Sequence, residues 1–220
     1  MVSSDRIITI LNVLEKATEG MPKPLIQELE GIFGKDSFIT LIACLLSLRS
    51  RDVITLGVCK KLFERVRSPE ELISVPLLEL EQMLHSVGFY RKKARIIREV
   101  SHELIDRFNS AVPWREEELL SLKGVGRKTA NLVRGTAFGI PAICVDVHVH
   151  QITNRLGWVI TKTPEETERA LMQLIPEEYW ISLNYLLVVW GQNICVSVSP
   201  WCSRCAIRPW CPQIGVIKKR

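Results

Sequence analysis

The sequence lacks an apolar stretch long enough to cross a lipid bilayer. The longest apolar run, Phe38 to Leu48, is interrupted only by Thr40 and Ser47 and is much shorter than the roughly 20 residues that a spanning helix needs. The N-terminus, MVSSDRIITILNVLEK, also lacks the basic segment, apolar segment and small-residue cleavage site of an export signal. We therefore expect an intracellular protein with no membrane partner.

The sequence also lacks sustained alternation of apolar and polar residues, which is the pattern of a half-buried strand. Apolar residues recur instead at helical spacing, first at Ile7, Ile10, Leu11 and Leu14, behind Ser4 or Asp5 as a cap. Further helices are expected over Leu25–Phe33, from Asp36 or Ser37 to Leu48, from Val53 to about Val66 with Asp52 as its cap, after Ser68, over Pro76–Leu84 and Arg91–Phe108, after Thr163, and from Glu177 to about Ile194. The predicted fold class is all-α.

Composition sets broad limits on the partner. The chain has 220 residues, of which 47% are hydrophobic and 24% are charged, as in an ordinary globular protein. Its net charge of +5 and isoelectric point near 8.9 suit a polyanionic partner. Many basic proteins never bind a polyanion, so the charge alone does not identify one.

The seven cysteines fall into two groups. Cys44, Cys59 and Cys144 are scattered on apolar segments and are expected to be small buried hydrophobes. The other four follow the spacing C-x6-C-x2-C-x5-C within 17 residues, at Cys195, Cys202, Cys205 and Cys211. Four thiolates so close together would repel one another, so the group predicts a metal centre. Spacing alone leaves structural zinc open as its occupant.

Residues 121–135, SLKGVGRKTANLVRG, carry a glycine turn followed by a helix. Gly124 and Gly126 flank Val125, and a short helix over Glu116–Leu122 precedes them. Glycines allow a phosphate to approach the backbone, and the first turn of a helix offers N–H donors to it. The segment can therefore grip a nucleic-acid backbone without reading bases. A purely structural turn with a solvated Lys128 is the alternative.

The string K-G-V-G-R-K-T-A-N, the V-D-V-H motif with Asp146 eighteen residues after Lys128, and the four-cysteine group together resemble the endonuclease III family of helix-hairpin-helix DNA glycosylases. The resemblance covers nearly the whole chain. It implies base-excision repair of oxidised pyrimidines in double-stranded DNA, with abasic-site lyase activity. It also favours a 4Fe-4S cluster over zinc at the four cysteines. A monomer in the cytoplasm of a prokaryotic cell, at the nucleoid, is expected.

The resemblance further implies two helical lobes. Residues 31–140 would form an inserted helical-barrel lobe that carries the hairpin at about 115–136. Residues 1–30 and 141–220 would form a second lobe, with the cluster loop at 195–211. Lys128 and Asp146 would then face each other across the boundary between these lobes.

Lys128 and Asp146 are the expected catalytic residues. The Lys128 amine would attack C1′ and become a Schiff base, which permits β-elimination of the 3′ phosphate. It must react as a neutral amine, and desolvation, the helix N-terminus and Arg127 are expected to favour that form. Asp146 would stay ionised and stabilise the positive charge that develops as the base leaves. Asp146 could equally cap the helix that follows it, and the two roles are compatible.

DNA contacts are expected from residues on several segments. By resemblance, Arg49 and Phe89 enter the gap left by the flipped nucleotide, where family members often have glutamine and leucine. The alternatives are a surface arginine and a core phenylalanine. Lys123 and Val147 also depart from the proline and threonine that the family usually has. The remaining expected contacts are Gly124, Val125, Gly126, Arg127 and Thr129 in the hairpin, His148, Arg91 within the basic group Arg91, Lys92, Lys93, Arg95 and Arg98, and Arg204 beside Arg208.

Two other functions are compatible with part of this pattern. A monofunctional mismatch glycosylase of the same superfamily has another residue in place of Lys128. A non-catalytic helix-hairpin-helix module with a structural metal would keep the glycines and cysteines but has no need of Lys128 together with Asp146.

Overall fold

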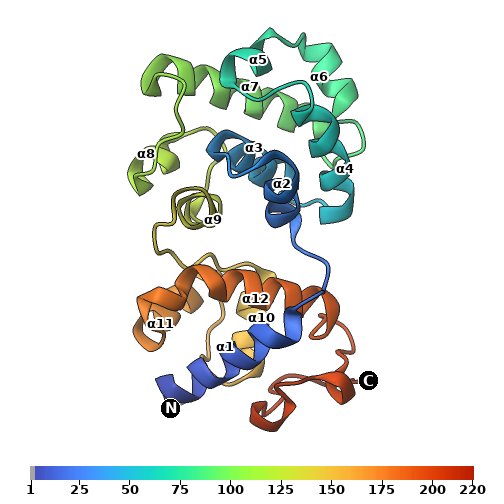
Figure 1. The fold of residues 1–220 in the computed structure, drawn as a ribbon, viewed down its shortest axis with the longest axis vertical. Coiled ribbons are helices and arrows are strands. Elements are labelled where there is room, and N and C mark those ends of the chain that lie inside the picture. Colours follow the sequence, from blue (N-terminus) through green and yellow to red (C-terminus); the bar gives the residue numbers. More distant parts are fainter. Residues whose placement is uncertain (1–2) are drawn as a thin grey trace. The chain divides into compact units, whose positions relative to one another are not determined.

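The structure is a computed structural model that describes residues 3–220, and its regular elements in that range are all helical, so the predicted fold class is confirmed. The elements are α1 (Ser4–Thr18), α2 (Leu25–Phe33), α3 (Ser37–Ser47), α4 (Asp52–Phe63), α5 (Pro69–Ser74), α6 (Leu77–Met83), α7 (Tyr90–Phe108), α8 (Glu116–Ser121), α9 (Arg127–Phe138), α10 (Val147–Arg155), α11 (Pro164–Leu174), η1 (Glu177–Tyr179), α12 (Trp180–Asn193), η2 (Cys202–Arg204) and η3 (Arg208–Trp210) (Figure 1). None of these helices is long and apolar enough to cross a membrane.

The chain divides into two compact units. The middle unit is Pro24–Gly139, and the terminal unit combines the segment up to Lys23 with Ile140–Arg220. The boundary expected after residue 30 is therefore wrong by several residues at the first crossing. Helix α2 belongs to the middle unit because Leu25, Ile26 and Leu29 are buried in that unit's core.

Helix α3 is the centre of the middle unit, where it contacts α2, α4, α7 and α9 (Figure 1). Its residues Phe38–Leu46 are all buried, as the uninterrupted apolar run predicts. Asp36 caps its N-terminus by accepting a hydrogen bond from the Ile39 N–H at 2.8 Å. Burial of this helix on every side fixes where its C-terminal end, next to Arg49, lies within the unit.

In the terminal unit, the N-terminal segment packs against the C-terminal part of the chain. Helix α1 packs against α12, and α10 packs against α11 and α12 (Figure 1). The apolar stripe of α1 supplies Ile7, Ile10, Leu11 and Leu14 to a core that also buries Trp190. This core supports α10, which carries Asp146 at its start, and the cysteine loop after α12.

Two caps differ from those expected. Ser3, not Ser4 or Asp5, is the N-cap of α1, and it makes no side-chain cap hydrogen bond. The Ser4 hydroxyl donates instead to the Leu174 carbonyl at 2.6 Å. Helix α4 has Arg51 at its N-cap, so Asp52 lies inside the first turn, where a carboxylate favours the positive end of the helix dipole.

Candidate active site and cysteine pocket

The hairpin consists of α8, a turn and α9, all within the middle unit. Gly124 has φ 76°, and a Cβ atom there would lie 3.0 Å from Cγ2 of Ile96 on α7. Both the backbone conformation and the close approach of α7 therefore require glycine at this position. The predicted turn is confirmed, and α7 supports it from beneath.

Lys128 is exposed in the first turn of α9. The N-cap of this helix is Gly126, which has no side chain to accept hydrogen bonds from that turn. Helix α9 packs on α3, where burial raises the pKa of the Cys44 thiol to about 12 and the positive charge of Lys128 opposes that rise. The Lys128 side chain is thus exposed, while its charge lies close enough to act on a buried thiol of α3.

Glu116 braces the hairpin, and sequence reasoning did not find it. It lies at the start of α8 and pairs with Arg127 at 3.4 Å and with Arg134 at 3.0 Å, both on α9. The Glu116 carboxylate therefore compensates positive charge within the hairpin and joins α8 to α9. The sequence gives no local sign of the ion pair between Glu116 and Arg127, because these residues are eleven positions apart and meet only when the hairpin folds.

Two of the expected DNA contacts in the hairpin are largely covered. Val125 is 7% exposed and Thr129 is 3% exposed, because both side chains face the core of the middle unit. These side chains support the hairpin from within, so the expected DNA contacts of Val125 and Thr129 would have to come from their backbone atoms. The part of the hairpin that faces outward is formed by Gly124, Gly126, Arg127 and Lys128.

Arg49 and Phe89 share an unusual backbone conformation. Both have positive φ, 54° for Arg49 and 60° for Phe89, which is uncommon for residues other than glycine and concentrates at functional sites. Phe89 is 64% exposed, so it is not a core phenylalanine. Together they line one pocket in the middle unit, whose other lining residues are Leu45, Leu48, Lys92, Lys93, Ile96 and Gly124.

The basic group at the start of α7 does not form a single exposed face. Arg91 is exposed and lies 3.9 Å from Glu81. Lys93 is only 6% exposed, and Arg98 donates to the Val75 carbonyl. Lys93 and Arg98 therefore point inward and not toward a phosphate. Lys93 faces α3, and Arg98 faces the segment between α5 and α6.

Asp146 is the N-cap of α10 in the terminal unit. Its Oδ1 atom accepts hydrogen bonds from the N–H groups of His148 and Val149, both at 2.9 Å. The capping role weighed from the sequence is therefore present. Because both bonds go to the same oxygen, the carboxylate is held in one orientation.

His148 lies against α12 at a glycine that the sequence did not single out. A Cβ atom at Gly191 would lie 2.3 Å from Nδ1 of His148, so only glycine leaves room for the imidazole. That buried Nδ1 has no hydrogen-bond partner within residues 3–220. A lone glycine inside the apolar pattern of α12 is the signal that could have revealed this close packing.

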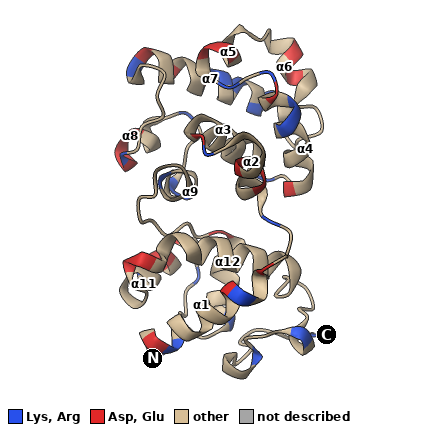
Figure 2. Ribbon diagram, viewed as in Figure 1, with Lys and Arg blue, Asp and Glu red and all other residues tan. Residues whose placement is uncertain are grey.

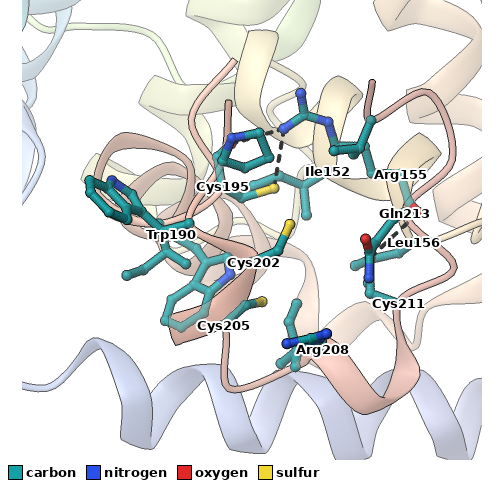
Figure 3. A pocket seen from close by; sticks show the side chains of 15 residues that line it. Ile152, Arg155, Leu156, Trp190, Cys195, Cys202, Cys205, Arg208, Cys211 and Gln213 are labelled. Atoms are coloured by element: carbon teal, nitrogen blue, oxygen red, sulfur yellow. Dashed lines mark hydrogen bonds between the residues drawn. The ribbon is translucent and has the colours of Figure 1, made fainter. Parts of the chain in front are cut away.

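The four clustered cysteines line one pocket of the terminal unit, with their sulfurs directed into a shared space (Figure 3). About 420 Å³ there is free of protein atoms, part of it open to solvent. In the described part of the chain, no three His, Cys, Asp or Glu side chains converge closely enough to hold a single metal ion.

The pocket suits thiolate ligands only if positive charge compensates them. Burial raises the pKa of Cys195 and Cys211, and raises that of Cys205 to about 11 against an opposing hydrogen bond with the Ile207 backbone. The buried indole Nε1 of Trp190 has no hydrogen-bond partner within residues 3–220. Protonated thiols and an unsatisfied N–H are what a sulfur-ligated metal group would convert into bonded partners.

Arg155, at the end of α10, fastens the loop that carries these cysteines. Its guanidinium donates to the Cys195 sulfur at 3.3 Å (Figure 3). It also donates to the carbonyls of Cys195, Val196 and Ser197 at 3.3, 3.0 and 2.8 Å. Sequence reasoning missed this residue, because an arginine at the end of a helix is an ordinary pattern.

Comparison with known proteins assigns the chain to a family. Residues 42–177 match the model of the HhH-GPD superfamily base excision DNA repair proteins. Endonuclease III of Thermotoga maritima is 47% identical over 176 residues, which cover 80% of this chain and 83% of the relative. Endonuclease III of Bacillus subtilis is 39% identical over 177 residues, covering 80% of this chain and 81% of the relative.

Solved structures agree with the sequence comparison. A non-covalent complex of endonuclease III with DNA is similar with a TM-score of 0.85 and 38% identity, covering 97% of both chains. A trapped covalent endonuclease III–DNA intermediate is similar with a TM-score of 0.85 and 37% identity over the same shares. The chain belongs to the HhH-GPD superfamily of base excision DNA repair proteins and, within it, to the endonuclease III group of DNA glycosylases with abasic-site lyase activity.

Proposed function

We propose that this enzyme removes oxidised pyrimidines from double-stranded DNA through a Schiff base on Lys128, and then cleaves the strand by β-elimination. The observation that carries the proposal is an exposed lysine in the first turn of α9, directly after the Gly126 N-cap. A phosphate held by the hairpin would bring the adjacent sugar to this amine. The damaged nucleotide must leave the stack to reach it.

In the proposed reaction the Lys128 nitrogen bonds to C1′ while the bond from C1′ to the base breaks, and the base departs with a proton. The sugar ring then opens to give the iminium. Loss of a proton from C2′ expels the 3′ phosphate, a step that a water nucleophile would not permit. The similarity to an endonuclease III trapped as a covalent intermediate with DNA supports a covalent route in this chain.

Asp146 is proposed to stabilise the positive charge that develops on the sugar. Two backbone N–H groups hold its Oδ1 atom, so the carboxylate is fixed in orientation before DNA binds. A fixed carboxylate needs little rearrangement as charge develops, which is the basis of electrostatic preorganisation. The same two hydrogen bonds would therefore serve both the cap and the catalysis.

DNA contacts are proposed for both units. Arg49 and Phe89 would fill the space left by the flipped nucleotide, and the outward part of the hairpin, with Arg91 and His148, would hold the backbone. Arg204 adds to a strongly positive segment, because residues 179–220 contain five Lys or Arg and no Asp or Glu (Figure 2). The preceding 178 residues balance 24 basic side chains with 24 acidic ones. The whole net charge thus lies in the segment around the cysteine loop.

Cys195, Cys202, Cys205 and Cys211 are proposed to hold a 4Fe-4S cluster. Four sulfurs around a shared volume, buried thiols and the unsatisfied Trp190 N–H support this assignment. When bound, the cluster would supply iron–thiolate bonds that fix the loop carrying Arg204. Purified protein should absorb visible light and contain about four irons per chain. Stoichiometric zinc without iron would contradict the proposal.

The proposed enzyme acts as a monomer on chromosomal DNA, at the nucleoid in the cytoplasm of a prokaryotic cell. Its target is a single damaged nucleotide, which gives no reason to require two copies of the chain. Sedimentation of the protein with and without a short lesion duplex would test the proposed stoichiometry of one chain per lesion.

Borohydride trapping on a duplex that contains thymine glycol tests the proposed chemistry. The lysine mechanism predicts base release together with a covalent protein–DNA complex after reduction. A monofunctional mismatch glycosylase would release its base without a trapped complex. A non-catalytic DNA-binding module would bind the duplex and do neither, so each alternative has its own result.

A further inference from the structure

Lys93 is a buried lysine that the proposed mechanism does not use. It lies in the first turns of α7 and is 6% exposed. Its Nζ atom donates a hydrogen bond to the Leu46 carbonyl at 2.8 Å. Leu46 is in the last turn of α3, where carbonyl groups lack partners within the helix and carry the negative end of its dipole.

This hydrogen bond connects two segments with strained backbones. Arg49 follows Leu46 by three residues and has φ 54°. Phe89 precedes Lys93 by four residues and has φ 60°, and its carbonyl accepts from the Lys93 N–H at 3.0 Å. A second close approach lies nearby, because a Cβ atom on Gly88 would be 3.3 Å from the Arg49 carbonyl oxygen.

Left-handed conformations of arginine and phenylalanine persist only where surrounding contacts hold them. The Lys93 side chain reaches from one of these segments to the other, and it lines the same pocket as Arg49 and Phe89. Neighbouring Lys92 lines the same pocket but is exposed. The two lysines therefore differ in burial while sharing charge, sequence position and pocket.

We infer that Lys93 is a positioning residue that ties the C-terminal end of α3 to the start of α7, and so fixes Arg49 and Phe89 side by side for insertion into the opened duplex. This inference rests on the proposed insertion of those two residues. Lys93 itself contacts neither DNA nor the reacting sugar. Its removal should therefore affect duplex binding while leaving the Schiff-base chemistry intact.

The test uses the complete holoenzyme with Lys93→Met, which keeps the apolar stem and removes the donor. Affinity would be measured by fluorescence anisotropy on a duplex with a tetrahydrofuran abasic analogue and on the same strand alone. We expect a loss of about tenfold on the duplex and little change on the single strand. Borohydride trapping on a single-stranded abasic site should remain at the wild-type level.

Lys92→Met is the matched control, since it also removes one positive charge from the pocket. It should weaken both substrates to the same small extent. A duplex-specific loss as large as that of Lys93→Met would overturn the positioning role and assign the effect to charge. If Lys93→Met does not fold, Lys93→Gln takes its place, because its amide nitrogen lies one atom nearer the backbone and so falls short of the Leu46 carbonyl. A duplex affinity equal to wild type in that variant would also overturn the inference.

A double-mutant cycle with Arg49→Ala separates positioning from general stability. If Lys93 acts through Arg49, Lys93→Met should cost little further duplex affinity once Arg49 is alanine. Fully additive losses would refute the inference. If Arg49→Ala alone weakens duplex and single strand equally, the proposed insertion by Arg49 fails instead, so the two failures are distinguishable.

Discussion

Lys128 and Asp146 are proposed to act at different steps, and their variants should separate these steps. Lys128→Gln should eliminate the borohydride-trapped complex while keeping affinity for an abasic analogue, because the hairpin turn remains. Asp146→Asn should slow base release by about 100-fold or more, since it removes one well-placed charge. It should still give trapped complex on a preformed abasic site, where no base has to leave.

The control for this pair is thermal unfolding of both variants. Asn can also accept through its side-chain oxygen, so Asp146→Asn should retain the cap of α10 and melt near wild type. Undiminished trapping in Lys128→Gln would assign the covalent bond to another amine. Loss of trapping in Asp146→Asn at a preformed site would move Asp146 to the lyase step.

Lys93 should give the stability of the protein a distinctive pH dependence. Burial lowers its pKa from 10.5 to about 8, although the charge of Cys59 acts in the opposite direction. Between these values the unfolded chain binds a proton that the folded chain does not. Folding stability should therefore rise as pH increases from about 8 to 10.5, by at most about 3 kcal/mol.

This rise must be read as a difference between wild type and Lys93→Met. Burial raises the pKa of Cys44 and Cys59 from 9.0 to about 12, so both thiols lower stability as pH increases above 9. Urea unfolding of the two proteins at pH 7 and pH 10 cancels that common contribution. An equal pH response in both proteins would show that Lys93 is not the buried amine responsible.

Among the elements, the hairpin gives a paired prediction for its two glycines. Gly124→Ala should destabilise the fold by about 1–3 kcal/mol, because φ is 76° and the new Cβ would press on Ile96. Gly126 has φ −104° with open space around a Cβ, so Gly126→Ala should melt near wild type. If a phosphate approaches Gly126 closely, that variant should nevertheless lose abasic-DNA affinity.

Anisotropy and thermal unfolding of these two variants would decide the point. Equal stability losses would mean that the turn tolerates a side chain at Gly124. Unchanged DNA affinity in Gly126→Ala would remove the argument for close backbone approach at that glycine and would place the phosphate elsewhere on α9.

Sequence patterns predicted those elements whose conformation is determined by neighbouring residues. The glycine turn, the apolar run of α3 and the cap at Thr163, which forms a complete capping box with Glu166, could be read from neighbouring residues. Lys93 could not, because its burial depends on α3 lying against α7. The conformations of Arg49 and Phe89 were also hidden, since neither residue favours positive φ on its own.

At the scale of the whole molecule, the family resemblance implied two lobes, but the first boundary lies after Lys23 instead of after residue 30. Gly20, Pro22 and Pro24 interrupt the helical pattern near the crossing, but Leu25 and Leu29 would suit either core. The side that α2 takes is decided by its packing with α3 and α4. Glu116 and Arg155 were missed for the same reason, as each joins elements that approach only after folding.

The distribution of charge over the whole chain leads to a final prediction. All of the net charge of +5 lies in residues 179–220 (Figure 2), yet the cations there differ in role. Arg220 donates to the Ser199 carbonyl and stacks on Trp201 at 3.8 Å, so it secures the loop. Lys218 and Lys219 are exposed beside it, and Lys219 donates a surface hydrogen bond to Oε1 of Gln213 at 2.7 Å.

Lys218→Gln with Lys219→Gln should therefore reduce the salt slope of lesion-duplex binding by up to about 2, since each phosphate contact contributes about 0.9. Lys60→Gln with Lys61→Gln is the control, because it changes the net charge equally in the charge-balanced part of the chain. If the two double variants lose the same slope, net charge alone governs attraction. A loss confined to the first would place the DNA backbone along the cysteine loop, which Arg155 fastens and the proposed cluster would fix further.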